Sequence, residues 1–216
     1  MSEAHLNEPF CRIIRHPVLS HNLTKLRDAE TQPMEFRRVL EQLSSLMAYE
    51  VTRDLGTTAK KISTPLEDTH SPMVSDDMAI VTIMRAGNGM LDGLLRMLPF
   101  SRVGHIGIYR DKFTKQTVEY YFRLPQQIKG RTVLLADPLI ATGDTAVAAV
   151  DRLKQYGVGT IRFVSVLAAP EGLAKLHESH PDLEVYTLSV ERQLNDMGYI
   201  LPGLGDAGDR LYGTHI

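Results

Sequence analysis

The stretch LLADPLIATGDT at residues 134–145 carries the pattern from which the fold of this chain is inferred. An apolar run at 132–136 is typical of a buried strand, and it ends at the carboxylate of Asp137. A loop of small residues then leads into an amphipathic segment, 146–156, that ends at Gly157. A buried strand followed by a short loop and a helix is the repeating unit of a parallel sheet.

The same alternation extends in both directions from this stretch, beginning after Ser71-Pro72. The pattern predicts strands at 79–84, 103–109, 117–124, 132–136, 160–168 and 184–190, and helices at 90–98, 146–156 and 173–180. Apolar runs without polar alternation indicate strands that are buried on both faces. We therefore expect an α/β fold with a mostly parallel central sheet flanked by helices.

The N-terminal part differs, because one long amphipathic helix is expected there, from Thr31 to Leu55. Thr31 is its expected N-cap, and Pro33 and Glu35 suit its first turn. Its apolar stripe consists of Phe36, Val39, Leu40, Leu43, Leu46, Met47 and Val51. Such spacing predicts a packing surface, and a subunit interface is one way of packing it.

Composition places the chain among soluble globular proteins and predicts a single domain, residues 1–216, with 43% hydrophobic and 23% charged residues. The formal net charge of -2 offers no basic surplus for nucleic-acid binding. No apolar run approaches the length of a membrane span, and Met1 to Pro9 lacks a signal-peptide pattern, so we expect a cytoplasmic protein with no membrane contact. The single cysteine, Cys11, permits no internal disulfide.

The loop after Asp137 has the features of a phosphate cradle. Backbone N–H groups at a helix start are unpaired and attract anions, and Thr142 and Thr145 add hydroxyl donors beside Gly143. The loop lacks the lysine of a P-loop. Asp137 would then accept hydrogen bonds from sugar hydroxyls or order metal-bound water. The competing interpretation is a capped helix with an ordinary turn.

Two arginines follow other predicted strands. Arg85 leaves a strand beside Gly87 and Gly89, and Arg110 opens a polar segment between two strand-like runs. Guanidinium groups from separate loops are suited to clamp a diphosphate, although surface ion pairs explain each arginine singly as well.

The C-terminal segment contains GLGDAG at 203–208, which matches a dinucleotide-binding fingerprint by letter. Such a fingerprint must follow a first strand in a βαβ unit, and only eight residues remain after Gly208, so we reject that interpretation. The glycines leave backbone groups accessible, which suits the recognition of a flat heterocycle.

Other candidate sites are weak. His177 and His180 are expected at a solvated helix end rather than at a metal site, and Lys60-Lys61 as a solvated pair. No activated nucleophile is evident, since Cys11 has no helix start behind it.

Together these segments resemble the uracil phosphoribosyltransferase family. DPLIATG at 137–143 is similar to the phosphoribosyl diphosphate (PRPP) motif of type I phosphoribosyltransferases, and YILPGLGDAGDR at 199–210 is similar to the family's uracil-binding signature. Two positions depart from the family pattern. Asp144 would repel a phosphate unless it points outward, and Asn88 stands where leucine is usual.

The resemblance implies the type I phosphoribosyltransferase fold with a β-hairpin hood and an N-terminal helical extension. It also implies the conversion of uracil and PRPP to UMP and diphosphate. The implied catalytic residues are Arg85, Arg110, Asp137 and Asp206. The implied PRPP-binding residues are Arg85, Arg110, Asp137, Pro138, Leu139, Ile140, Ala141, Thr142, Gly143, Asp144, Thr145 and Asp206. The implied uracil-binding residues are Tyr199, Ile200, Gly205, Asp206 and Ala207.

The resemblance further implies Mg2+ held through PRPP and water without a direct protein ligand, GTP as an effector, and a homodimer or homotetramer. Residues 111–121 would fold over PRPP and exclude water, and no general base is evident. Two rival hypotheses are an enzyme acting on another nucleobase and an RNA-binding sensor of uracil nucleotides.

Overall fold

The computed structural model describes residues 10–75, 77–110 and 117–214, with the side chain of Arg110 left out. The helices are α1 (Pro17–Arg27), α2 (Pro33–Val51), α3 (Asn88–Met97), α4 (Asp144–Gln155), α5 (Pro170–Ser179) and α6 (Ala207–Tyr212). The strands are β1 (Cys11–Ile13), β2 (Thr57–Ser63), β3 (Asp68–Val74), β4 (Met78–Met84), β5 (Arg102–Arg110), β6 (Thr117–Arg123), β7 (Thr132–Ala136), β8 (Leu139–Ile140), β9 (Ile161–Val164), β10 (Leu167–Ala168), β11 (Glu184–Thr187), β12 (Ser189–Val190), β13 (Gln193–Leu194) and β14 (Ile200–Leu201).

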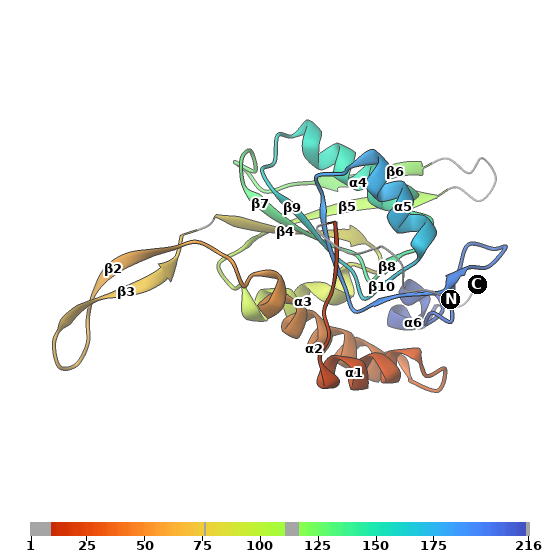
Figure 1. The fold of residues 1–216 in the computed structure, drawn as a ribbon, viewed down its shortest axis with the longest axis horizontal. Helices are drawn as coiled ribbons and strands as arrows, with labels where there is room; N and C mark the ends of the chain where they lie inside the picture. Colours follow the sequence, from red (N-terminus) through yellow and green to blue (C-terminus); the bar gives the residue numbers. More distant parts are fainter. Residues whose placement is uncertain (1–9, 76, 111–116, 215–216) are drawn as a thin grey trace.

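A seven-stranded sheet in the order β1-β11-β9-β7-β4-β5-β6 forms the centre of the molecule (Figure 1). All neighbouring pairs are parallel except β5 and β6, which form an antiparallel hairpin. The predicted α/β class with a mostly parallel sheet is therefore confirmed.

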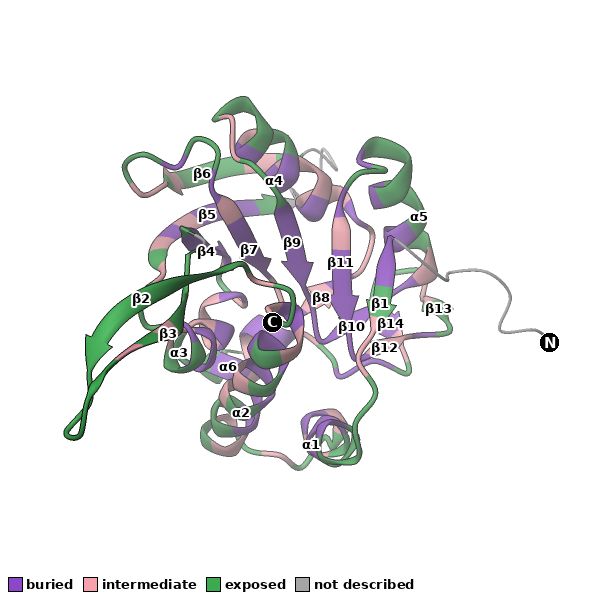
Figure 2. Ribbon diagram, turned by 60° about the vertical axis from the view of Figure 1, so that its left-hand side comes forward, coloured by how far each residue is buried: buried purple, intermediate pink, exposed green. Residues whose placement is uncertain are grey.

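Helices cover both faces of this sheet, as its apolar strands require (Figures 1 and 2). Ile80 of β4 and Leu134 of β7 pack with α1, α2 and α3 on one face. Val81 and Leu135, the next residues along the same strands, pack with α4 and α5 on the other. Because successive side chains of a strand alternate between faces, a continuous apolar run supplies two cores at once.

The N-terminal prediction needs two corrections. The N-terminal part contains two helices instead of one. Helix α1 was not predicted, and α2 spans Pro33–Val51 rather than 31–55. The N-cap of α2 is Gln32, and the Thr31 hydroxyl instead donates to the Lys25 carbonyl at 2.6 Å. The predicted packing surface is confirmed, because all residues of the stripe except Leu46 are buried in the core of the subunit.

Two predicted strands each divide in two. Residues 160–168 form β9 and then β10, and 184–190 form β11 and then β12. Both segments leave the central sheet after their first strand. β10 then pairs with β8 and β12 to form a second, three-stranded sheet. This small sheet supports the residues that directly follow Asp137.

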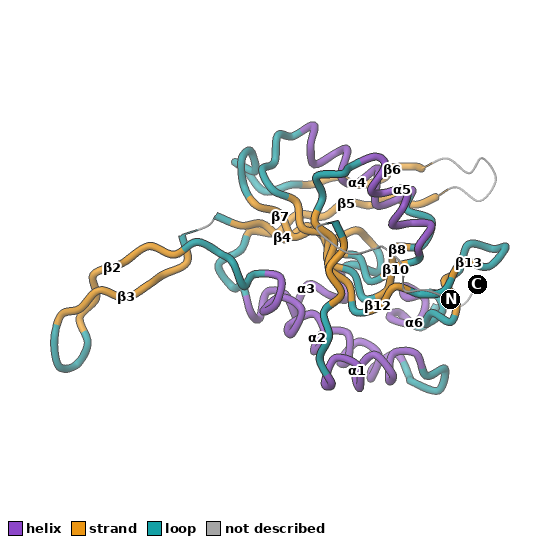
Figure 3. Tube along the Cα trace, viewed as in Figure 1, coloured by secondary structure: helices purple, strands orange, loops and turns teal. Residues whose placement is uncertain are grey.

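The hairpin of β2 and β3 was not predicted, and Ser71-Pro72 lies inside β3 rather than at a boundary. Its two strands pair only with each other in the described part of the chain, and they extend away from the body as an arm (Figures 1 and 3). Lys60 and Lys61 are exposed on this arm, as expected.

The prediction that His180 lies at a solvated helix end was wrong, because His180 is only 4% exposed. Its Nε2 lies 3.4 Å from both the Val147 carbonyl and an Asp151 carboxylate oxygen. The ring of His177 packs on Phe10 at a centroid distance of 4.4 Å. Both histidines therefore hold α5 against its neighbours. Cys11 is buried, and burial raises the pKa of its thiol to about 11.

Among the described residues, no helix is long and apolar enough to cross a bilayer.

Candidate functional site

The topology concentrates loops at one point of the central sheet. From β4 the chain crosses to β5 on one side, whereas β7, β9 and β11 follow one another on the other side. The direction of winding thus reverses between β4 and β7, and such switch points open crevices at the carboxyl ends of strands. Arg85 directly follows β4 and Asp137 directly follows β7, so both lie at this point.

Close backbone packing brings the two loops together. A Cβ atom built on Gly87 would lie 2.4 Å from the carbonyl oxygen of Ala136 and 2.6 Å from that of Ile83. Only glycine permits the loop after β4 to lie this close to the end of β7. The Arg85 loop and the Asp137 loop therefore form one surface.

Two adjoining hollows lie on this surface, and they share Ala86, Asp206 and Gly208. The first, of about 240 Å³, is lined by Ala86, Asp137, Leu139, Ala141, Gly198, Tyr199, Ile200, Gly205, Asp206, Ala207 and Gly208. The second, of about 360 Å³, is lined by Met84, Arg85, Ala86, Ile108, Tyr109, Tyr120, Asp206 and Gly208. Predicted residues from three separate segments thus meet around one cleft.

Asp137 and Asp206 are the carboxylates of the first hollow. Burial raises the pKa of Asp137 to about 8, the Leu139 N–H opposes that rise, and the charge of Asp206 adds to it. Asp206 is the N-cap of α6, and its Oδ1 accepts from the Asp209 N–H at 2.9 Å. Neither carboxylate forms an ion pair with a described residue, and a cation near both would relieve their repulsion.

The predicted phosphate loop lines the first hollow through Asp137, Leu139 and Ala141 and continues to Gly143, which is the N-cap of α4 with φ of +83°. Within the described chain, no group accepts a hydrogen bond from the backbone N–H of Thr142, Gly143 or Thr145. These donors fit an anion. The Thr142 hydroxyl, however, donates to Asp144 Oδ2 at 2.9 Å instead of pointing to the loop centre.

The two departures from the family pattern turn away from the cleft. Asp144 forms an ion pair with Lys175 of α5, outside the loop. Asn88 Oδ1 accepts from the Thr82 hydroxyl at 2.6 Å, and Thr82 Oγ1 lies 2.8 Å from His105 Nδ1. Asn88 therefore takes part in a polar contact beneath the Arg85 loop rather than facing the site.

The C-terminal segment is held in place by two anchors. Arg210 donates to the Leu204 carbonyl at 2.9 Å and to the Asp28 carbonyl at 2.5 Å, and its guanidinium lies 4.5 Å from the Phe36 ring centroid. Glu191 accepts from the Gly203 N–H at 3.1 Å and pairs with Arg27 at 2.6 Å. These contacts fix the residues between them, including Gly205, at the wall of the cleft.

Ile108, Tyr109 and Gly198 line the cleft although the sequence analysis gave them no role, and Tyr120 lies in the segment 111–121 that was expected to cover PRPP. Tyr109 and Tyr120 face each other across the β5–β6 hairpin with ring centroids 6.0 Å apart. In the sequence, Tyr109 could have been identified from its position directly before Arg110, which was a predicted site residue. Arg110 ends β5, and its side chain and residues 111–116 of the expected cover lie outside the described residues.

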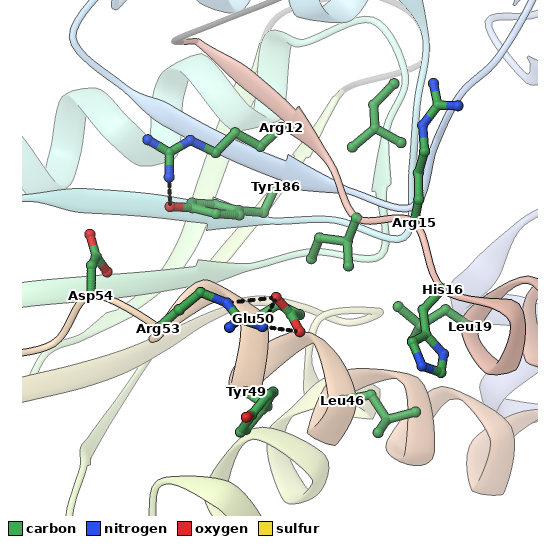
Figure 4. A pocket seen from close by; sticks show the side chains of 12 residues that line it. Arg12, Arg15, His16, Leu19, Leu46, Tyr49, Glu50, Arg53, Asp54 and Tyr186 are labelled. Atoms are coloured by element: carbon green, nitrogen blue, oxygen red, sulfur yellow. Dashed lines mark hydrogen bonds and ion pairs between the residues drawn. The ribbon is translucent and has the colours of Figure 1, made fainter.

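A larger groove of about 690 Å³ lies elsewhere, between β1, the start of α1 and the second half of α2 (Figure 4). Arg12 donates to the Tyr186 hydroxyl at 3.2 Å there, and Arg53 pairs with Glu50 at 2.8 Å. This groove contains none of the residues that follow β4 or β7. Glu50 and Arg53 pair with each other there, and Asp54 pairs with Arg162 outside the groove, so it is a poorer candidate for catalysis than the smaller cleft.

No group of three or more His, Cys, Asp or Glu side chains in residues 10–75, 77–110 and 117–214 is placed to hold a metal ion.

The comparisons with known proteins agree with this geometry. Residues 13–214 match the family model described as "Uracil phosphoribosyltransferase". The chain is 49% identical over 203 residues to the uracil phosphoribosyltransferase of Agrobacterium fabrum, covering 94% of this chain and 97% of the relative. It is 50% identical over 215 residues to that of Polaromonas naphthalenivorans, covering 99% and 100%. The solved structure of the AQ2163 protein from Aquifex aeolicus superposes with a TM-score of 0.92 at 33% identity, covering 96% of this chain and 100% of that one.

Proposed function

The chain belongs to the uracil phosphoribosyltransferase family, and from this membership we propose how the residues of the cleft carry out the family's reaction. The enzyme transfers the phosphoribosyl group of PRPP to uracil, which gives UMP and diphosphate in pyrimidine salvage. The observation that supports the assignment of roles is the meeting of the Asp137 loop, the Arg85 loop and the C-terminal segment around one cleft.

The loop Asp137-Pro138-Leu139-Ile140-Ala141-Thr142-Gly143-Asp144-Thr145 binds the ribose 5-phosphate part of PRPP in this proposal. Free N–H groups at Thr142, Gly143 and Thr145 receive the 5-phosphate. Asp137 accepts hydrogen bonds from the ribose hydroxyls at the floor of the hollow. Leu139 and Ile140 fix the loop, because they form β8 of the small sheet.

Arg85 binds the diphosphate. Its guanidinium lines the second hollow, beside Tyr109 and Tyr120, and is the cation there whose side chain the structure describes. Arg110 serves as the second cation, by the family resemblance. Positive charge at this end of the cleft lowers the cost of the leaving group's negative charge in the transition state.

Uracil binds against the C-terminal segment. Tyr199, Ile200, Gly205, Asp206 and Ala207 all line the first hollow, and their backbone groups read the edge of the base. N1 of uracil forms a bond to C1′ of the ribose while the bond from C1′ to the diphosphate oxygen breaks, and the electron pair leaves with diphosphate. The N1 proton passes to water in this proposal.

Mg2+ accompanies PRPP in this reaction, where it neutralises part of the phosphate charge. Asp137 and Asp206 fit this ion, because the two carboxylates share a hollow and their charges repel each other. We propose that they hold its hydration water rather than the ion directly. The β5–β6 hairpin, with Tyr109 and Tyr120, excludes water from the reacting atoms.

We propose that the enzyme works as a homodimer or homotetramer. A two-stranded hairpin is only marginally stable alone in water, and the β2–β3 arm leaves Leu66 95% and Met73 46% exposed. A second copy of the chain that covers the arm would remove this apolar surface from water. The arm thus replaces the buried α2 stripe as the expected interface.

We also propose GTP as an effector, bound in the groove between β1 and α2. Tyr49 is 58% exposed there, which suits base stacking, and Arg12 has no ion pair among the described residues. Arg12→Ala should abolish any rise in activity with added GTP and leave the rate without GTP unchanged. We propose a cytoplasmic location for the enzyme, because its substrate PRPP and its product UMP are phosphorylated.

Radiolabelled uracil, cytosine, hypoxanthine and orotate, each supplied with PRPP and Mg2+, test the base assignment. Uracil should be converted to UMP far faster than any other base is converted to its nucleotide. A preference for another base would overturn the assignment of the C-terminal segment. Retention of RNA on a filter in place of UMP formation would favour the RNA-binding sensor, which the net charge of -2 disfavours.

A further inference from the structure

Lys175 of α5 reaches the phosphate loop from outside. Asp144, the first residue of α4, lies inside this loop, and its carboxylate forms an ion pair with the Lys175 ammonium. The same carboxylate accepts a hydrogen bond from the Thr142 hydroxyl at 2.9 Å. A carboxylate beside a bound phosphate dianion opposes binding, so the cation at this position bears directly on the affinity of the loop.

The backbone of α5 is packed tightly against the loop, which fixes where Lys175 can lie. A Cβ atom on Gly143 would be 2.7 Å from the Gly172 carbonyl oxygen, and one on Gly172 would be 2.2 Å from the Ala141 carbonyl oxygen. Lys175 follows Gly172 by three residues and therefore lies on the same face of α5. The helix presents its ammonium group to the loop without any rearrangement of the backbone.

The Thr142 hydroxyl has one hydrogen to give. In the structure that hydrogen is directed to Asp144, so it is not directed to a phosphate oxygen. An ammonium group carries three donors, and Lys175 satisfies Asp144 when the threonine hydroxyl turns away. Thr142 then becomes a donor to the phosphate.

We propose that Lys175 is a positioning residue of the 5-phosphate site: it neutralises Asp144 and so releases the Thr142 hydroxyl to the phosphate. This inference rests on the proposed assignment of residues 142–145 to the 5-phosphate. It goes beyond that assignment because it places α5, which contributes no residue to the cleft lining, in the substrate site.

A second ion pair, between α4 and the turn that follows α5, provides the matched control. Lys154 near the end of α4 pairs with Asp182 at 2.6 Å, and these side chains are 37% and 68% exposed. Asp144, in contrast, has a side chain only 16% exposed. Exposed pairs contribute little because water screens them, whereas the shielded Asp144 charge acts more strongly on its surroundings.

The experiment compares UMP binding by the wild type, Lys175→Met, Lys154→Met and the double variant Lys175→Met/Asp144→Asn. UMP carries the 5-phosphate without a diphosphate, so its binding tests the loop independently of the diphosphate site. Lys175→Met should weaken UMP binding and raise the PRPP KM by about tenfold, with diphosphate inhibition unchanged. The double variant should regain near wild-type UMP affinity, because neither charge remains. Lys154→Met should bind UMP as the wild type does.

Equal UMP binding by Lys175→Met and the wild type would overturn the inference and leave the proposed function intact. A double variant that keeps the full defect would also overturn it, since Lys175 would then act on the phosphate and not through Asp144. A wild type that binds neither UMP nor PRPP would overturn the proposed function itself. Thermal melting of each variant separates these results from loss of the fold.

Discussion

The guanidinium of Arg85 lies 3.1 Å from the Asp209 carboxylate, which joins the loop after β4 to helix α6 of the C-terminal segment. The Tyr212 hydroxyl strengthens this junction by donating to the Arg85 carbonyl at 3.1 Å. Arg85, proposed to bind diphosphate, and the C-terminal segment, proposed to bind uracil, therefore fix each other's position. A change at either residue should affect both substrates.

Arg85→Ala should lower kcat/KM for PRPP by roughly 10²-fold, the typical loss when a group that stabilises transition-state charge is removed. The Arg85 side chain is 53% exposed, so the melting temperature should hardly change. Steady-state kinetics and thermal melting measure the two effects. Arg96→Ala is the control, because Arg96 is an exposed helical arginine that pairs with Glu41 away from the cleft.

Asp209→Asn should raise the KM for both PRPP and uracil several-fold and leave the fold intact. Its carboxylate orients Arg85 and also accepts from the Thr214 hydroxyl at 2.6 Å, so the amide would loosen the junction on both sides. Initial-rate measurements with each substrate varied in turn provide the test. An effect on the PRPP KM alone would show that the two subsites are independent.

Asp137 should make the stability of the ligand-free enzyme depend on pH. Burial raises the pKa of its carboxyl from 3.8 to about 8, so between these values the folded protein binds a proton that the unfolded chain has released. The free energy of unfolding should therefore fall as pH rises from about 4 to 8. Urea unfolding at several pH values measures this slope, and Asp137→Asn should show a shallower one. Equal slopes in the two proteins would contradict a raised pKa at this residue.

The central sheet could be predicted from the sequence because its strands carry their signal locally. The run at 132–136 coincides with β7, and 79–84 falls within β4, since both runs are largely apolar and each is followed directly by a charged residue. The cleft was predictable for the same reason, because Arg85 and Asp137 directly follow these strands. The splits at Ser165 and Leu188 could not be predicted, since strand-like residues continue across both positions and only the tertiary pairing of β10 with β8 and β12 divides them.

Other features depend on contacts that no local pattern contains. The β2–β3 arm has exposed residues on both faces, so neither strand shows the alternation by which a strand is recognised. Lys175 could not be linked to the phosphate loop, because 31 positions separate it from Asp144 and only the packing of α5 brings them together. Arg27 and Glu191 are likewise distant in sequence, 164 positions apart.

Glu191→Gln should destabilise the enzyme by about 3 kcal/mol, the lower part of the range for breaking a buried ion pair, because Arg27 remains 27% exposed. Burial raises the pKa of Glu191, but hydrogen bonds from Arg27, Ser189 and Gly203 outweigh it and leave the pKa below 4.5. The stabilisation that the Glu191 carboxylate provides is therefore fully present above its pKa in the unfolded chain. It is lost as the pH falls through the lower pKa of the folded protein.

Chemical unfolding at neutral pH measures this loss. Glu35→Gln is the matched control, because Glu35 pairs with Arg38 in a similar two-bond geometry on an exposed helix surface, where water screens the pair and its loss should cost far less stability. The uracil KM should rise only in Glu191→Gln, since the Gly203 N–H loses its charged acceptor. Equal stability losses in the two variants would show that the buried network has no special role.

Substitutions on the β2–β3 arm should dissociate the oligomer while leaving the chain folded. Ile62 and Met73 lie on one face of the arm, because Ile62 pairs with Thr69, Thr58 pairs with Met73, and residues two and four positions apart on a strand share a face. Ile62→Lys/Met73→Lys places two charges on the apolar part of that face, where a covering subunit would have to desolvate them. Light scattering should then give the 24.1 kDa mass of a single chain, against a multiple of it for the wild type. Ser63→Lys adds a charge on the opposite face and should leave the mass unchanged, whereas an unchanged mass in the double variant would contradict an interface at this face of the arm.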